Sequence, residues 1–306
     1  MTSYKQDGTV GPWAHEKLDC LGKYLAAYTT VLRKRSWCEG YFYIDAFAGA
    51  GKAPLRKEQA GTPAERQVQQ AIFEDLVQSA DDNDKSTYVE GSPYVALDIP
   101  HPFTRYYFID LNSELTSKLN SIADEYGDTR DIRILPADAN HAITENILGD
   151  TSINWRKNRA VIFLDPFGMQ VKWDTIAKIA TTNAIEIIVN LPVGMAIQRL
   201  LARSGEISEA RRNTLNEYFG TDEWENIVYE QSTDLFGDRV DKVENSGHRL
   251  ARWYQGRLKE AFGYASPARL IRNSQRGHLY YLLWAGPNKT GAKIATHVLS
   301  QGEAID

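Results

Sequence analysis

Aspartates follow apolar runs at three places in the chain, and a glycine turn follows the first of them. The stretch "YFYIDAFAGAGKAP" contains Asp45, Gly49 and Gly51, while Asp110 ends "YYFI" and Asp138 follows "RILPA". In parallel α/β proteins such positions lie at the carboxyl edge of the sheet, where ligands bind. A short glycine turn lets the backbone approach the methionine part of S-adenosylmethionine, an acid after the second strand accepts its ribose hydroxyls, and an acid after the third meets its adenine amino group.

Two other nucleotide-binding patterns fit the turn less well. A P-loop needs a glycine five positions before Gly51 and a hydroxyl residue after Lys52, but the chain has Ala46 and Ala53 there. A dinucleotide site needs a third glycine, which is missing. The residues resemble the class I methyltransferase pattern more closely, and this resemblance implies an S-adenosylmethionine site with the residue roles given above. The alternative is a tight turn that holds no ligand. The predicted cofactor residues are Asp45, Ala46, Phe47, Gly49, Gly51, Asp110, Leu111, Asp138 and Ala139.

A fourth apolar run ends in "FLDPFG", which resembles the Asp-Pro-Pro-Tyr type motif of amino-methyltransferases. In that motif the Asp and a prolyl carbonyl accept hydrogen bonds from the target amine, and positioning supplies much of the catalysis. Asp165 and Pro166 match the motif, Phe167 replaces the second proline, and Gly168 replaces the aromatic residue. The resemblance implies that Asp165, Pro166 and Phe167 meet the acceptor. The alternative is that Asp165-Pro166 only ends a strand and caps a turn.

Other candidates would lie on the substrate side. His15, with Lys17, could close over the pocket, Lys52 adjoins the glycine turn, Ser92 begins a helix and Asn190 ends a strand. Each has an ordinary alternative, such as a surface residue or a helix cap. The spacing of His, Cys and acidic residues suggests no metal site.

A local excess of positive charge could meet phosphates, although a solvated helix face is an equal alternative. It lies between residues 249 and 276, where the only acid is Glu260. The basic residues there are Arg249, Arg252, Arg257, Lys259, Arg269, Arg272 and Arg276. Of these, Arg249, Arg252 and Arg272 are the predicted substrate contacts.

The elements that would position these residues alternate between apolar strands and helices. Strands are expected at 41–47, 105–110, 159–168, 184–192, within 131–140, and at "ARLIR" and "HLYYLLWAGP"; helices at 13–35, 61–78, 91–98, "NSELTSKLNSIADEYG" and "TGAKIATHVLSQ". Such alternation predicts a mainly parallel sheet covered on both faces. We expect an α/β, Rossmann-like class I methyltransferase fold. Its expected parts are a helical segment (1–40), the cofactor-binding core (41–193), a helical insertion acting as lid or substrate platform (194–262), and last strands and helix completing the core (263–306).

Composition limits the class of protein. The chain has 306 residues, of which 42% are apolar and 25% charged, so it is typical of a soluble globular protein. A net charge of −5 argues against nonspecific coating of nucleic acid. Two cysteines, no apolar run long enough for a membrane span and no signal sequence predict a cytoplasmic protein with no membrane partner.

Six stretches together resemble a known family. They are "WAHEKLDCLGKYL", "YIDAFAGAGK", "GSPYVAL", "YFIDLN", "FLDPFG" and "YYLLWA…TGAKIATHVL". They are similar to the three-Cys-motif partner family (TcmP), bacterial proteins with a methyltransferase-like Rossmann domain. The resemblance covers Trp13 to about Leu299, is weakest at about 200–245, and implies a three-Cys-motif protein as partner. It does not supply a reaction.

The sequence thus supports two main hypotheses. In the first, the protein transfers a methyl group from S-adenosylmethionine to an amine of nucleic acid or a modified nucleoside. In the second, it is a non-catalytic binding or assembly protein that serves its three-Cys-motif partner. Hydrolysis by the clustered carboxylates ranks last, because no histidine partner or metal-binding spacing accompanies them.

Overall fold

A computed structural model describes residues 13–54, 88–202, 205–234, 237–273 and 276–305. The predicted helix at 61–78 lies outside these residues. The helices are α1 (Trp13–Leu32), α3 (Ser92–Leu97), α4 (Ser113–Tyr126), α5 (Ala139–His141), α6 (Trp173–Thr181), α7 (Gln198–Leu200), α8 (Glu209–Phe219), α9 (Trp224–Val228), α10 (Ser246–Phe262) and α11 (Lys289–Leu299), with short irregular turns η1 (Gly127–Thr129), η2 (Ala142–Ile147) and η3 (Val193–Ile197). The strands are β1 (Gly40–Asp45), β2 (Lys52–Pro54), β3 (Tyr88–Glu90), β4 (Arg105–Ile109), β5 (Ile132–Leu135), β6 (Asn158–Leu164), β7 (Ile185–Leu191), β8 (Tyr229–Asp234), β9 (Gly237–Lys242), β10 (Tyr264–Ala265), β11 (Ala268–Arg272), β12 (His278–Gly286) and β13 (Ala304–Ile305).

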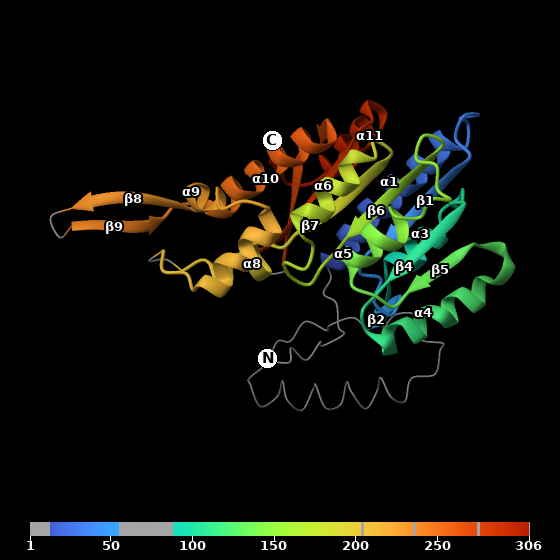
Figure 1. The fold of residues 1–306 in the computed structure, drawn as a ribbon, viewed down its shortest axis with the longest axis horizontal. Coiled ribbons are helices and arrows are strands. Elements are labelled where there is room, and N and C mark those ends of the chain that lie inside the picture. The colour runs from blue at the N-terminus through green and yellow to red at the C-terminus, as the bar shows by residue number, and fades with distance from the viewer. Residues whose placement is uncertain (1–12, 55–87, 203–204, 235–236, 274–275, 306) are drawn as a thin grey trace.

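The central sheet has parallel strand pairings on one side and antiparallel pairings on the other. In the described part of the chain its order is β13-β11-β12-β7-β6-β1-β4-β5, and β10 also pairs with β12. The part of this order from β7 to β5 can be followed in Figure 1. Strands β5, β4, β1, β6 and β7 are parallel, in the 3-2-1-4-5 order of a Rossmann-like sheet. β12 runs antiparallel between β7 and β11. This is the predicted Rossmann-like class I methyltransferase fold, so the fold prediction is confirmed.

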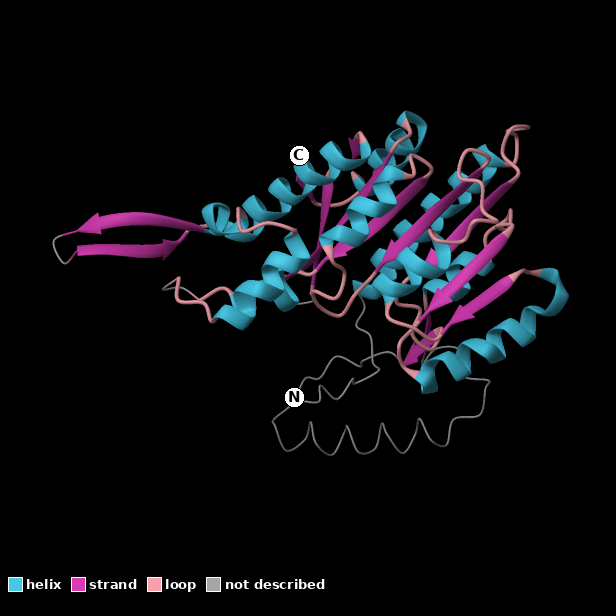
Figure 2. Cartoon of the chain, in the orientation of Figure 1, coloured by secondary structure: helices cyan, strands magenta, loops and turns pink. Residues whose placement is uncertain are grey.

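Helices cover both faces of this sheet (Figure 2). Alternation along the strands divides the core in two. One half holds Tyr43, Phe163 and Ile188 under α1, α3, α4 and α11. The other half holds Phe42 and Ile44 under α5, η2, α6 and α10. A residue two places after Tyr43, Phe163 or Ile188 therefore points to the α1 face, which places Asp45, Asp165 and Asn190 on that side of the carboxyl edge.

α1 lies against the sheet along a stripe with helical spacing. Leu21, Tyr24, Leu25 and Tyr28 are buried on it, at the three- and four-residue intervals that place side chains on one face. Lys17 lies four residues before Leu21 and seven before Tyr24, and so shares this stripe. The helix that buries the core thus also carries a cation toward the carboxyl edge.

The expectation that 194–262 is helical is wrong in part. β8 and β9 form an antiparallel hairpin there, which extends away from the central sheet (Figure 1). Its strand sequences, "YEQSTD" and "GDRVDK", lack the apolar-polar alternation that marks a half-buried strand. α10, in contrast, buries Leu250 and Tyr254 in the main core and is one of its covering helices.

Two further features bear on the site. The short β2–β3 pair follows the glycine turn and was not predicted from the sequence. Among the described helices, none combines the length and apolar character required to cross a membrane.

Candidate functional site

The turn after β1 is fixed across the carboxyl ends of the neighbouring strands. The amide of Ala46 donates to the Phe163 carbonyl of β6 at 3.0 Å, and the amide of Ala48 donates to the Ile109 carbonyl of β4 at 2.9 Å. The next backbone amides are therefore held at the centre of the carboxyl edge, where parallel α/β proteins bind ligands.

Gly49 and Gly51 give this turn its shape. Their φ angles are +61° and +77°, a region that side chains with a Cβ rarely adopt. A Cβ on Gly51 would lie 2.2 Å from Cδ1 of Ile122, whereas a Cβ on Gly49 would meet nothing within 4 Å. Gly49 thus presents bare backbone to open space, while Gly51 lies against α4. The turn continues into β2 and is tied to the start of α3 by the Gly91 amide, which donates to the Gly51 carbonyl at 2.6 Å.

Asp110, at the end of β4, is joined to the glycine turn. Its Oδ2 accepts the Gly49 amide at 3.0 Å and its Oδ1 accepts the Asn112 amide at 2.8 Å. A carboxylate offers about four lone-pair sites, so both oxygens retain capacity for further donors such as ribose hydroxyls. The next residue, Leu111, is 73% exposed, which leaves an apolar side chain at the edge for a flat ring to cover.

Asp138 lies after β5 and caps α5. Its Oδ1 accepts the His141 amide at 3.1 Å, and the side chain is exposed. Ala139 is buried beneath it. The carboxylate remains accessible from solvent, as the proposed contact with an adenine amino group requires.

Asp45 is fully buried beneath the turn. Its carboxylate accepts hydrogen bonds from the Tyr43 hydroxyl at 3.1 Å and the Phe47 amide at 3.4 Å. Burial raises the pKa of Asp45 to about 7, against the lowering effect of hydrogen bonds from Ser92 and Tyr43, and the nearby charge of Asp165 raises it further. Asp45 therefore organises the turn from below and does not itself face the cavity.

Asp165, at the end of β6, is held on both carboxylate oxygens. Lys17 of α1 pairs with Oδ2, and Asn190 of β7 donates to Oδ1 at 2.7 Å. The Lys17 and Asp165 side chains are 13% and 22% exposed, and the Lys17 amine also lies 5.4 Å from the centre of the Tyr280 ring. The Asn190 amide is oriented by this contact, because a carboxylate only accepts. Its own Oδ1 is buried with no hydrogen-bond partner among the described residues.

A cavity of about 130 Å³ joins these groups. Its walls come from α1, the glycine turn, the start of α3 and the end of β6. The lining residues are Ala14, Lys17, Leu18, Phe47, Ala48, Gly49, Ala50, Gly51, Lys52, Gly91, Ser92 and Asp165. The glycine turn and the Asp165 carboxylate therefore face one space, with Asp110 behind the turn.

The residues after Asp165 form a braced loop. Pro166 is buried and Phe167 is 69% exposed, so the phenyl ring is free to stack on a ligand. Asn140 of α5 fixes the far side of the loop: its Nδ2 donates to the Gln170 carbonyl at 2.8 Å, and its Oδ1 accepts the Lys172 amide at 2.9 Å. Asn140 was not predicted, since nothing in its sequence context distinguishes it from an ordinary turn residue.

The predicted substrate-side residues divide into two groups. Lys52 and Ser92 line the cavity, and the Lys52 amine lies 4.6 Å from the centre of the Tyr94 ring. His15 is exposed and does not line the cavity, whereas Lys17 does. The spacing of Lys17 from Leu21 and Tyr24, which places it on the apolar stripe of α1, is the sequence signal that distinguishes Lys17 from His15.

The basic residues between 249 and 276 are partly engaged within the protein. Arg272 pairs with Glu303 at 2.5 Å, and Arg269 pairs with Glu16 at 2.7 Å. Arg257 lies 3.9 Å from the centre of the Trp173 ring and donates to a backbone carbonyl. Arg249 and Arg252 are both exposed, on α10. The positive surface is smaller than the sequence count suggests.

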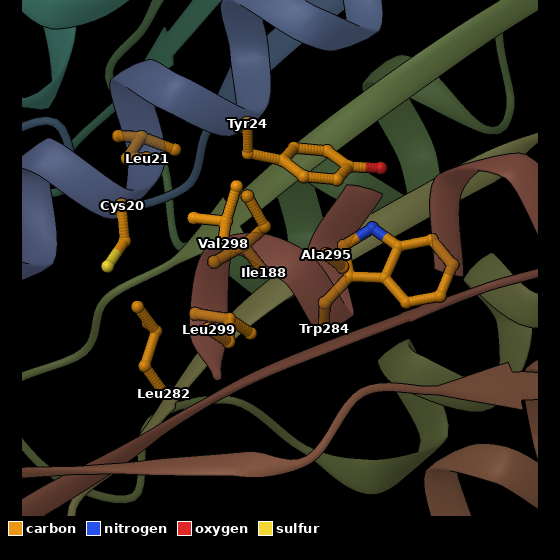
Figure 3. A pocket seen from close by; sticks show the side chains of 9 residues that line it. All are labelled: Cys20, Leu21, Tyr24, Ile188, Leu282, Trp284, Ala295, Val298 and Leu299. Atoms are coloured by element: carbon orange, nitrogen blue, oxygen red, sulfur yellow. The ribbon is translucent and has the colours of Figure 1, made fainter. Parts of the chain in front are cut away.

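A second, apolar pocket lies between α1, α11 and the sheet (Figure 3). Its volume is about 10 Å³, at the lower limit for holding one water. It is lined by Cys20, Leu21, Tyr24, Ile188, Leu282, Trp284, Ala295, Val298 and Leu299. Close by, the Tyr24 hydroxyl donates to the buried carboxyl of Glu186. The space is a packing gap of the core and no candidate for a ligand.

Comparison with known proteins gives distant structural likenesses. No family model and no curated protein matches the chain. Protein LPL1258 from Legionella pneumophila is similar in structure with a TM-score of 0.49 and 13% identity, over 92% of this chain and 89% of that one. An S-adenosylmethionine-dependent methyltransferase from Clostridium acetobutylicum is similar with a TM-score of 0.32 and 9% identity, over 88% of this chain and 92% of that one. The fold rests on the strand order described above.

Proposed function

We propose that the protein transfers a methyl group from S-adenosylmethionine to an amine. The observation that carries the proposal is the shared cavity: the glycine turn and the Asp165 carboxylate line the same space at the carboxyl edge of a class I methyltransferase sheet. A cofactor held by the turn would thus face the group that holds the acceptor.

The residues present fit the cofactor. Gly49 offers open backbone. The Asp110 carboxylate is oriented by two backbone amides and keeps lone pairs free for the ribose hydroxyls. The exposed carboxylate of Asp138 suits the adenine amino group, and Leu111 offers the adenine ring an apolar surface. When bound, S-adenosylmethionine supplies an electrophilic methyl group on its sulfonium.

The acceptor side would work by positioning. Asp165 accepts an N–H of the target amine, the Pro166 carbonyl accepts another, and together they direct the nitrogen lone pair. No strong base is needed, because the nitrogen becomes acidic as it is alkylated. The exposed Phe167 ring stacks on the acceptor, in place of the missing aromatic at position 168.

For the acceptor class we propose an amine of nucleic acid or of a modified nucleoside. The support is Phe167, since an exposed aromatic ring beside the amine site suits an unstacked base. A base in a duplex would have to be extruded to reach Asp165. A three-Cys-motif protein as partner is proposed from the sequence resemblance.

Calorimetric titration with S-adenosylmethionine and S-adenosylhomocysteine tests the proposal. Asp110→Ala should weaken binding by about 1–3 kcal/mol, because buried ribose hydrogen bonds are lost. Asp165→Asn should bind the cofactor nearly as well as the wild type but lose methyl transfer. Asp124→Ala, which removes an exposed carboxylate from α4, is the matched control. Absence of binding by the wild-type chain would refute the proposal.

The alternative is a non-catalytic assembly protein that keeps the fold. One observation favours it: Lys17 already holds the Asp165 oxygen that a target amine needs. In that case the chain would bind the cofactor, or no cofactor, and transfer methyl to no acceptor in the presence or absence of its partner.

A further inference from the structure

Lys17 stands in the position that the proposed function assigns to the acceptor. Its amine contacts Oδ2 of Asp165, and both residues line the cavity of the glycine turn. Its side chain is only 13% exposed, so it is directed inward from α1. An amine that reaches Asp165 from this cavity is therefore provided by the chain itself.

The surroundings suit a primary alkyl amine. The Asp165 carboxylate accepts from it, and the Tyr280 ring lies 5.4 Å away, within the range of a cation–π contact. Asp165, in direct contact with the amine, is placed to take up its proton and leave the neutral form. The neutral form has the lone pair that alkylation requires.

From this arrangement we propose that Lys17 is itself a methyl acceptor, modified in the site of its own chain. The inference rests on the proposed function and names a substrate for it. The Nζ–CH₃ bond forms as the S–CH₃ bond breaks, and the electron pair of the broken bond stays on sulfur, which yields S-adenosylhomocysteine. The proton that Nζ must lose passes through Asp165 to solvent.

The other lysine that lines the cavity is a built-in comparison. The Lys52 amine lies over the Tyr94 ring on the β2 side of the turn, and the residue is exposed. Lys17 is instead aligned by a carboxylate. Modification should therefore select Lys17 over Lys52, and over Lys23, which is exposed on α1 and paired with Asp19 at 2.6 Å.

The test is incubation of the purified full chain with methyl-labelled S-adenosylmethionine, followed by peptide mass mapping. Label is expected on the peptide that contains Lys17 and not on those that contain Lys23 or Lys52. Lys17→Arg should remove the label, Lys23→Arg should keep it, and Asp165→Asn should reduce it at least tenfold. Thermal melting of each variant verifies that the fold is retained.

A chemical footprint gives a readout that does not depend on turnover. Reductive alkylation with formaldehyde labels accessible lysines, and S-adenosylhomocysteine bound in the cavity should protect Lys17 but not Lys23. Failure of calorimetric binding would overturn the proposed function and this inference together. If the cofactor binds and Lys17 stays unmodified, or is labelled equally in Asp165→Asn, the inference alone is overturned.

Discussion

Glu186→Gln should make the protein more resistant to unfolding at alkaline pH. Glu186 lies in β7 beneath α1 and α11, with the Tyr24 hydroxyl as donor to its carboxyl. α11 crosses so closely that a Cβ on Gly291 would lie 2.6 Å from Oε1. Burial raises the pKa of Glu186 from 4.5 to about 7, because hydrogen bonds and the distant charge of Arg159 do not compensate for lost hydration.

The direction and size of this pH effect on the unfolding free energy follow from proton linkage. The folded state holds the Glu186 proton more tightly than the unfolded state, so its stabilising effect is complete below about pH 4.5 and is lost as pH rises through about 7. At 1.36 kcal/mol per pKa unit, the full loss is on the order of 3 kcal/mol. A glutamine keeps the shape and an acceptor for Tyr24 but does not ionise.

Urea unfolding at about pH 5 and about pH 8 measures this loss. The difference in unfolding free energy between Glu186→Gln and the wild type should grow by about 2–3 kcal/mol between the two pH values. Any constant cost of packing the amide cancels in that comparison. Glu145→Gln, at an exposed carboxylate, is the control. Parallel pH profiles of Glu186→Gln and wild type would refute the reasoning.

Other substitutions test the turn, the loop and the basic face. Gly51→Ala should destabilise the fold more than Gly49→Ala, because only the Cβ on residue 51 would clash with Ile122. For Gly49→Ala the main cost is backbone strain of about 1–2 kcal/mol. Thermal melts in which Gly49→Ala is the less stable variant would contradict the turn geometry. Asn140→Ala should lower methyl transfer while cofactor affinity by calorimetry is kept; equal loss of both would refute its role as a brace of the 165–172 loop. Arg257→Ala should lower the melting temperature, because Arg257 packs on Trp173. Arg252→Ala, at an exposed position, should leave the melting temperature unchanged and reduce the salt slope of binding to single-stranded RNA by about 1. The opposite pattern would contradict the structural role of Arg257 and the nucleic-acid role of Arg252.

The carboxyl edge was predictable because apolar runs that alternate with helices indicate a parallel sheet. Strands that are apolar throughout imply a parallel sheet, and in such a sheet the ends of β1, β4 and β6 lie at one edge. The structure bears this out: Asp110 holds the glycine turn directly, and Asp45 and Asp165 are close enough for one charge to raise the pKa of the other. Their roles toward a cofactor stay predictions.

The side chains that contact these acids could not be predicted from the sequence. Which side chain of α1 meets Asp165 depends on how far the helix slides along the sheet, and that is decided by tertiary packing of its buried stripe. The β8–β9 hairpin was missed because its strand sequences carry no apolar alternation. Arg257 was counted with the basic surface, since the sequence does not show that Trp173 lies beneath it.

A crystal structure of the chain with S-adenosylhomocysteine would show whether the cofactor lies between Asp110 and Asp165. We expect the ribose hydroxyls on Asp110, the amino-acid part against the glycine turn, and the sulfur facing the Asp165–Lys17 pair. An adenosyl group bound elsewhere, or bound at this edge with its sulfur turned away from Asp165, would contradict this arrangement.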